Sequence, residues 1–360
     1  MKFRMAVACA FSLVAGAIGA LGQQNWPPVN EGDFTTRDFH FQTGEVLSEV
    51  RIHYSTLGKP VQDASGRTTN AVLILHGTGG SGQSLLRPIF AGELFGRGQP
   101  LDAEKYFIIL PDNIGHGKSS KPSDGMHARF PQYDYADMVE LQEQLVVKGL
   151  GVNHLLLILG TSMGCMHSWM WGETHPDFMD ALMPLACLPV QIAGRNRIWR
   201  KMIIDGIRQD PGWLGGEYKT QPAAALQIAA DMQLIAGSAP LHMQEDMPTR
   251  DAADKYLEDT TKRTMASMDA NDYLYAVSSS RNYDPSALLD RIQVPVMFIN
   301  SADDFINPPE LGVAEREIRK VKKGKFILLP ASEATHGHGT HTWAAVWKKY
   351  LQDLLEMSQH

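Results

Sequence analysis

A serine flanked by glycines stands out as a candidate nucleophile in this sequence. Residues 160–164 read G-T-S-M-G, with Ser162 at the centre. The apolar run 155–159 precedes them, and a segment of helical character, 165–171, follows. A strand, a sharp turn and a helix in this order strain the serine backbone and lift its hydroxyl above a sheet. We therefore predict Ser162 as the nucleophile of an acyl-transfer reaction; the alternative is a glycine-rich turn with a capping serine.

A serine hydroxyl needs a base that takes its proton and an acid that orients that base. With this type of turn, the acid and then the histidine follow later in the chain. The predicted strand 295–300 leads into Asp303 and Asp304, in a loop closed by Pro308. We favour Asp304 as the acid, which leaves Asp303 to cap a turn.

Three histidines lie close together after the last predicted strand, where residues 335–341 read T-H-G-H-G-T-H. We predict His338 as the base, with His336 second and His341 third. The spacing also resembles the H-x-H-x-D-H zinc pattern, but Thr340 occupies the aspartate position and no second ligand set supports a metal. The sequence therefore predicts neither a metal nor a cofactor.

An oxyanion forms during acyl transfer, and two backbone N–H groups usually stabilise it. One is predicted at Met163, directly after the nucleophile. The other is expected in the segment 76–80, H-G-T-G-G, which follows the predicted strand 71–75. We favour Thr78, with Gly79 as the alternative. No G-K-[ST] follows these glycines, which argues against a phosphate-binding loop. In the next loop, His116 is expected to be structural.

Short apolar runs alternate with longer amphipathic segments, which predicts an α/β fold with a doubly wound, mainly parallel sheet. Strands are expected at 50–54, 71–75, 106–110, 155–159, 182–186, 294–300 and 325–329. Residues 190–285 break this alternation, with helices expected at 198–206, 221–236 and 252–268. We predict a core domain formed by residues 23–189 and 286–360, with 190–285 inserted as a helical lid.

The first residues have the character of a secretory signal peptide. Lys2 and Arg4 precede the uncharged, apolar run 5–21, and small residues allow cleavage near Gly22. The alternative, an uncleaved anchor, is less favoured because the run is short for a bilayer span. We therefore expect residues 1–22 to be removed and the protein to be periplasmic or secreted. No later segment is apolar enough for stable membrane insertion.

Composition excludes several classes of protein. The 360 residues carry 33 Lys and Arg against 40 Asp and Glu, a net charge of −7, which becomes −9 once Lys2 and Arg4 are removed. This acidic balance disfavours nucleic-acid binding. Three cysteines cannot form a disulfide scaffold. After export, Cys165 and Cys187 remain; they could pair, but their apolar surroundings favour two buried thiols.

The motifs and their order resemble the α/β-hydrolase fold, and in particular its homoserine O-acetyltransferase branch. The resemblance rests on F-P at 130–131, G-T-S-M-G-C-M at 160–166, H-P-D-F at 175–178 and M-D-A-N-D-Y-L-Y at 268–275. It covers roughly residues 35–355. Three segments differ from that branch: 76–80, the loop 112–120, and G-H-G at 337–339, where the branch has G-H-D.

The resemblance implies acyl-transfer chemistry on a small-molecule ester or acyl substrate. Acetyl-CoA and homoserine are cytoplasmic metabolites, whereas water is available to an exported enzyme. We therefore predict an exported serine hydrolase that cleaves a carboxylic ester or related acyl bond through a Ser-His-Asp triad. The alternative is a homoserine O-acetyltransferase-like acyltransferase with the same triad. A silent binding protein is a third hypothesis, and the oligomeric state, a homodimer included, is left open.

Overall fold

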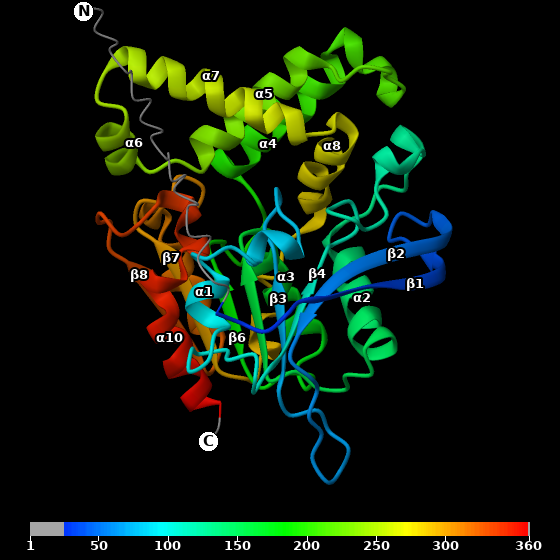
Figure 1. Cartoon of the computed structure of the whole chain (residues 1–360), viewed down its shortest axis with the longest axis vertical. Helices are drawn as coiled ribbons and strands as arrows, with labels where there is room; N and C mark the ends of the chain where they lie inside the picture. Colours follow the sequence, from blue (N-terminus) through cyan, green and yellow to red (C-terminus); the bar gives the residue numbers. More distant parts are fainter. Residues whose placement is uncertain (1–24, 359–360) are drawn as a thin grey trace, which may run out of the picture.

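An eight-stranded sheet forms the centre of the molecule (Figure 1). The computed structural model describes residues 25–358, so the predicted signal peptide lies outside the described residues. The strand order is β1-β2-β4-β3-β5-β6-β7-β8. Strands β3 to β8 pair in parallel, while β2 pairs antiparallel with both β1 and β4. The strands are β1 Asn30–His40, β2 Val46–Leu57, β3 Ala71–Leu75, β4 Phe107–Pro111, β5 Leu157–Thr161, β6 Leu182–Leu185, β7 Val296–Ser301 and β8 Gly324–Leu329.

Helices cover both faces of the sheet, as the apolar strands require. In β3, Leu73 and Leu75 belong to one core, which contains the apolar sides of α2 and α3. The intervening Val72 and Ile74 belong to a second core, on the face covered by α1 and α10. The helices of the two layers are α1 Ala91–Leu94, α2 Tyr135–Gln144, α3 Met163–Thr174, α9 Val313–Glu317 and α10 Ala344–Met357. The predicted α/β fold with a mainly parallel sheet is confirmed.

Five more α-helices lie between β6 and β7, within the predicted insertion 190–285. They gather at one end of the sheet (Figure 1) and pack around their own core, which includes Trp199, Ile203 and Leu226. These helices are α4 Gly194–Gln209, α5 Ala223–Ala236, α6 Pro240–Asp246, α7 Arg250–Ser267 and α8 Ala270–Ser278. We refer to α4–α8 as the helical insertion. Within residues 25–358, no helix combines the length and apolar character needed to cross a bilayer.

The structure differs from the expected elements mainly at the amino end. The strand expected at 50–54 is only the middle of β2, and β1 was not expected. Most of β1 is polar and at least partly exposed, so its sequence lacks the apolar run of a central strand. The strand expected at 155–159 begins two residues too early, because the apolar Leu155 makes only an isolated bridge with Met179.

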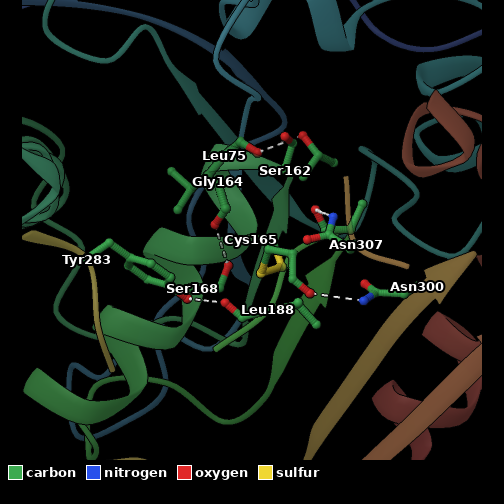
Figure 2. Close-up of a disulfide and its surroundings, with 12 residues drawn as sticks. Leu75, Ser162, Gly164, Cys165, Ser168, Leu188, Tyr283, Asn300 and Asn307 are labelled. Atoms are coloured by element: carbon green, nitrogen blue, oxygen red, sulfur yellow. Dashed lines mark hydrogen bonds between the residues drawn. A yellow bond between two sulfur atoms is a disulfide. The ribbon is translucent and has the colours of Figure 1, made fainter. Parts of the chain in front are cut away.

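Cys165 and Cys187 form a disulfide bond (Figure 2), so the expectation of two free thiols is wrong. The physical reason is the pairing of two neighbouring strands. β5 and β6 run in parallel with Thr161 opposite Leu185, and both cysteines follow the ends of these strands. Their Cα atoms lie 5.9 Å apart, within the range that a disulfide bridges.

Candidate active site

Ser162 occupies the turn between β5 and α3. Its backbone has φ 53° and ψ −107°, a left-handed conformation that a serine adopts only when its surroundings enforce it. The flanking glycines are required by space: a Cβ at Gly160 would overlap the Gly164 carbonyl, and one at Gly164 would overlap the Leu75 carbonyl. The G-T-S-M-G segment thus forms the strained turn expected from the sequence.

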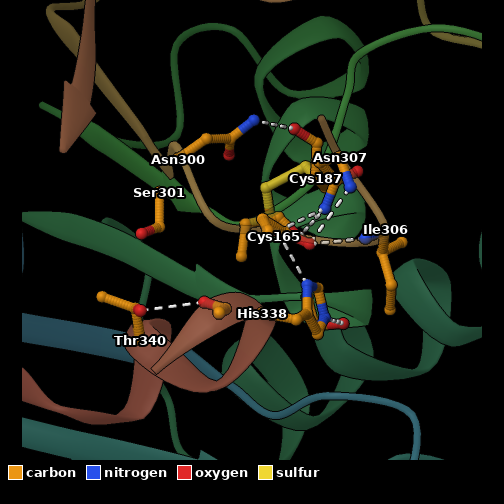
Figure 3. Close-up of polar contacts among 12 residues, drawn as sticks. Cys165, Cys187, Asn300, Ser301, Ile306, Asn307, His338 and Thr340 are labelled. Carbon is orange, nitrogen blue, oxygen red and sulfur yellow. Dashed lines mark hydrogen bonds and ion pairs between the residues drawn. A yellow bond between two sulfur atoms is a disulfide. The ribbon is translucent and has the colours of Figure 1, made fainter. Parts of the chain in front are cut away.

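The structure brings together the three side chains predicted for the triad. The Ser162 hydroxyl lies 2.8 Å from His338 Nε2. On the other side of the ring, His338 Nδ1 lies 2.9 Å from Asp304 Oδ2. Figure 3 shows His338 together with Ile306 and Asn307 of the loop that carries Asp304. Ser162 follows β5, Asp304 follows β7, and His338 lies in the 3-10 turn Gly337–Thr342 after β8. This arrangement allows the ring to accept the serine proton while the carboxylate orients it.

Asp304 is buried and held by its own loop. Its Oδ1 accepts hydrogen bonds from the backbone N–H groups of Ile306 (2.7 Å) and Asn307 (3.1 Å), and its Oδ2 accepts one from Asn307 Nδ2 (3.0 Å). Burial raises the pKa of Asp304, but the neighbouring His338 and the hydrogen bonds outweigh burial, so this pKa lies below its ordinary value. The carboxylate therefore stays ionised.

The competing aspartate has a different position. Asp303 accepts hydrogen bonds from Thr335 Oγ1 at 2.9 Å and from Gly337 N at 3.0 Å, and it contacts the Ser301 hydroxyl. It therefore connects the loop after β7 to the turn that carries His338. Asn307, which the sequence analysis did not single out, also donates to the Ala186 carbonyl at 3.1 Å. In the sequence, only the position of Asn307 three residues after Asp304 pointed to its role in holding that carboxylate.

The other two histidines of the cluster make different contacts from those of His338. His336 stacks between His242 of α6 and Trp343, with ring centroids 4.1 and 3.7 Å apart. His341 is partly buried beside His338, and the centroids of the two rings lie 5.1 Å apart. Burial, and to a lesser extent the neighbouring His338, lowers the pKa of His341 to about 3. Across residues 25–358, no group of three or more His, Cys, Asp and Glu side chains is arranged to hold a metal ion.

The loop predicted to stabilise an oxyanion lies against the nucleophile. A Cβ at Gly77 would lie 3.3 Å from Ser162 Cβ, so this loop passes close to the serine. Gly164 N donates to the His76 carbonyl at 3.0 Å, which ties the loop to the start of α3. His116 Nε2 lies 3.0 Å from the Thr78 carbonyl oxygen, a structural contact as expected.

A cavity of about 340 Å³ lies over these groups, between the sheet and the helical insertion. Thr78, Ser162 and His338 line it from the core domain. Arg200 of α4 lines the cavity from the helical insertion, and its side chain is buried. This residue was not selected in the sequence analysis. Arg200 donates to Asn196 Oδ1 and Ser280 Oγ, and among the described residues it forms no ion pair with a carboxylate. Arg87, Gln233 and Thr342 add further polar groups.

Known proteins resemble this chain over most of its length. A probable acyltransferase from Methanothermobacter thermautotrophicus is 28% identical over 304 residues, which cover 84% of this chain and 91% of that protein. A homoserine O-acetyltransferase from Deferribacter desulfuricans is 30% identical over 344 residues, covering 84% of this chain and 88% of that enzyme.

Two solved structures share the fold. A homoserine O-acetyltransferase from Bacillus anthracis superposes with a TM-score of 0.79 at 20% identity, covering 91% of this chain and 97% of that one. An acetylester hydrolase from Corynebacterium glutamicum has a TM-score of 0.79 at 21% identity, covering 91% and 96%. The family described as alpha/beta hydrolase fold matches residues 70–332. The chain therefore belongs to the alpha/beta hydrolase fold family and resembles its homoserine O-acetyltransferase branch.

Proposed function

We propose that this protein is an acyltransferase, which moves an acyl group from an activated ester or thioester to the hydroxyl of a small polar alcohol. The observation that supports this proposal most directly is the hydrogen-bonded chain from Ser162 through His338 to Asp304. The curated relatives named as acyltransferases support transfer over hydrolysis, because the likeness extends over more than four fifths of this chain. We therefore prefer the alternative named in the sequence analysis, a homoserine O-acetyltransferase-like acyltransferase, to the predicted hydrolase.

In the proposed reaction, His338 Nε2 takes the proton of Ser162 as the oxygen attacks the acyl carbon. The backbone N–H groups of Thr78 and Met163 stabilise the oxyanion. When the oxyanion collapses, the bond to the donor's leaving group breaks, and His338 returns the proton to that group. The result is an acyl-Ser162 ester. Throughout, Asp304 stays ionised and fixes the orientation of the imidazole.

The second half of the reaction repeats these steps with the acceptor. The acceptor hydroxyl loses its proton to His338 and attacks the acyl carbon, and Ser162 recovers the proton as its ester bond breaks. Arg200 supports an acceptor that carries a carboxylate, because a buried guanidinium with only neutral partners favours an incoming anion. Homoserine has such a carboxylate and a free hydroxyl.

Hydrolysis is the second candidate, in which water takes the place of the alcohol. The likeness in fold to an acetylester hydrolase is compatible with it. Export to the periplasm or the medium stays a prediction from residues 1–22. The Cys165–Cys187 disulfide supports it, because such bonds persist mainly in oxidising compartments.

The deciding experiment compares acceptor and water with one acyl donor. Purified protein comprising residues 23–360 is given an acetyl thioester, with and without homoserine, and both O-acetylhomoserine and acetate are measured by mass spectrometry. Acceptor-dependent formation of the ester supports transfer. Acetate release at the same rate with and without homoserine, and with a panel of other small alcohols, would contradict it. The Ser162→Ala variant is the control for both reactions.

A further inference from the structure

A second cavity, larger than the one above Ser162, lies between the helical insertion and the loop after β7. Its volume is about 870 Å³, within the range of small-molecule binding sites. Most of its wall is apolar, including Leu188, Val190, Ile192, Phe305, Ile306 and Leu311. We refer to this cavity as the apolar chamber. An acetyl group would leave nearly all of it unfilled.

The apolar chamber adjoins the reacting groups. Met166 and Ile306 line both the chamber and the cavity that contains Ser162. Met166 lies one helical turn after the nucleophile, and its N–H donates to the Ser162 carbonyl at 3.2 Å. Ile306 lies two residues after Asp304 and donates its N–H to that carboxylate. The wall between the two cavities is thus formed next to the nucleophile and the acid.

The side chains of this wall suit a passage for hydrocarbon. A methionine side chain is unbranched and changes its conformation at low cost, so Met166 can move aside for a chain attached at Ser162. Ile235 and Leu311 also line the chamber and are exposed to solvent, with 45% and 54% of their surface accessible. The chamber therefore opens to solvent between α5 and the loop after β7.

The two cavities differ in polarity, and this difference indicates which part of the substrate each one binds. Arg87, Arg200 and Gln233 line the cavity above Ser162, which suits a polar acceptor. The apolar chamber offers mainly hydrocarbon surface, although four charged residues also line it: Arg195, Asp303, Asp304 and Glu310. We propose that the apolar chamber binds the hydrocarbon tail of the acyl group, so that the preferred acyl donors carry medium-length chains of about six to ten carbon atoms. This inference rests on the proposed acyl transfer through Ser162.

Chain-length kinetics test the proposal. Acetyl, butyryl, octanoyl and decanoyl p-nitrophenyl esters are compared by kcat/KM. Each methylene buried in the chamber is expected to raise kcat/KM about threefold to fourfold until the chamber is full. A steady fall in kcat/KM from acetyl to octanoyl would overturn the proposal.

A variant that fills the chamber tests whether the dependence of kcat/KM on chain length arises there. Ile192→Trp narrows the chamber, and the octanoyl-to-acetyl ratio of kcat/KM is expected to fall about tenfold or more. Met202→Trp introduces the same side chain at an exposed position of α4, outside the residues that line the chamber, and is the matched control. Equal shifts of the ratio in both variants would refute the assignment to this cavity.

A binding measurement separates this proposal from the proposed function. The Ser162→Ala protein is titrated with octanoate and with acetate by calorimetry, and Ile192→Trp is added in the same background. Octanoate is expected to bind at least about tenfold more tightly than acetate, and the added tryptophan should remove this difference. Chain-dependent binding without acyl transfer would refute the proposed function alone. Acyl transfer with no chain dependence in binding or rate would refute the chamber alone.

Discussion

Asp303 and Asp304 are adjacent in the chain, yet their carboxylates serve different loops. Asp304 Oδ2 lies 2.9 Å from His338 Nδ1, whereas Asp303 Oδ2 accepts a hydrogen bond from Gly337 N at 3.0 Å. One carboxylate therefore contacts the imidazole, and the other fixes the backbone that carries it. This division of roles leads to opposite expectations for two isosteric substitutions.

The Asp304→Asn variant should lose most of its activity and keep its fold. An amide cannot stabilise the protonated imidazole, and kcat/KM is expected to fall about 10³-fold to 10⁴-fold. Asp303→Asn is the matched control, with a loss of about 1 to 2 kcal/mol in the free energy of unfolding and less than about a tenfold loss in kcat. Steady-state kinetics and urea unfolding measure both variants. If Asp303→Asn lost more kcat/KM than Asp304→Asn, Asp303 rather than Asp304 would be the acid that orients His338.

Glu173 of α3 should make the protein less stable as the pH rises. Burial raises the pKa of Glu173 to about 7, from an ordinary value of 4.5. The folded protein therefore holds a proton that the unfolded chain releases, and stability falls as the pH increases from about 4.5 to 7. Glu173→Gln should remove this dependence.

The expected gain at pH 8 is about 1 to 2 kcal/mol, allowing for partial solvent screening, with little difference at pH 4. Urea unfolding of both proteins at the two pH values measures it. If the variant were no more stable than the wild type at pH 8, the raised pKa would be wrong.

Gly160 is expected to tolerate no side chain. In Gly160→Ala the new Cβ would overlap the Gly164 carbonyl and the Ser168 hydroxyl, which forces β5 and α3 apart. We expect a loss of about 3 kcal/mol or more in stability, measured by thermal unfolding. Gly206→Ala is the control: it lies inside α4 with only ordinary contacts around a Cβ, and should be neutral or stabilising by about 0.5 to 1 kcal/mol. Similar losses in both variants would contradict the packing argument.

The Cys165–Cys187 disulfide should contribute measurably to stability. It closes a loop with a sequence separation of 22 residues, and removal of such a crosslink typically costs about 2 to 4 kcal/mol. The Cys165→Ala, Cys187→Ala double variant is compared with the wild type by urea unfolding with and without dithiothreitol. Reductant should lower the wild-type midpoint and leave the variant unchanged. Alkylation of both wild-type cysteines without reductant would show that the bond does not form.

The sequence predicted the central part of the fold well, because that part follows local rules. Parallel strands buried on both faces appear as apolar runs, and the strained turn around Ser162 requires glycines that the sequence displays. The choice of Asp304 over Asp303 rested on its distance from Pro308, and the structure places Asp304 against His338.

Other features depend on contacts between distant segments, which leave little trace in a sequence. The β1–β2 hairpin was missed because its edge strand is mostly polar. The disulfide depends on the register of β5 against β6, and the position of Arg200 in the cavity depends on how α4 packs against α5 and α8. The apolar chamber combines residues of the insertion with the segments before and after it, so no single motif indicates it.

The two ends of the helical insertion are fastened to each other as well as to the sheet. Cys187 anchors the outgoing chain through its disulfide, and the Tyr283 hydroxyl on the returning chain donates to the Leu188 carbonyl at 3.1 Å (Figure 2). The catalytic carboxylate and imidazole come later in the chain, outside this closed loop. We therefore expect that changes within the helical insertion alter the walls of the two cavities while the anchored chain ends keep the reacting groups in place.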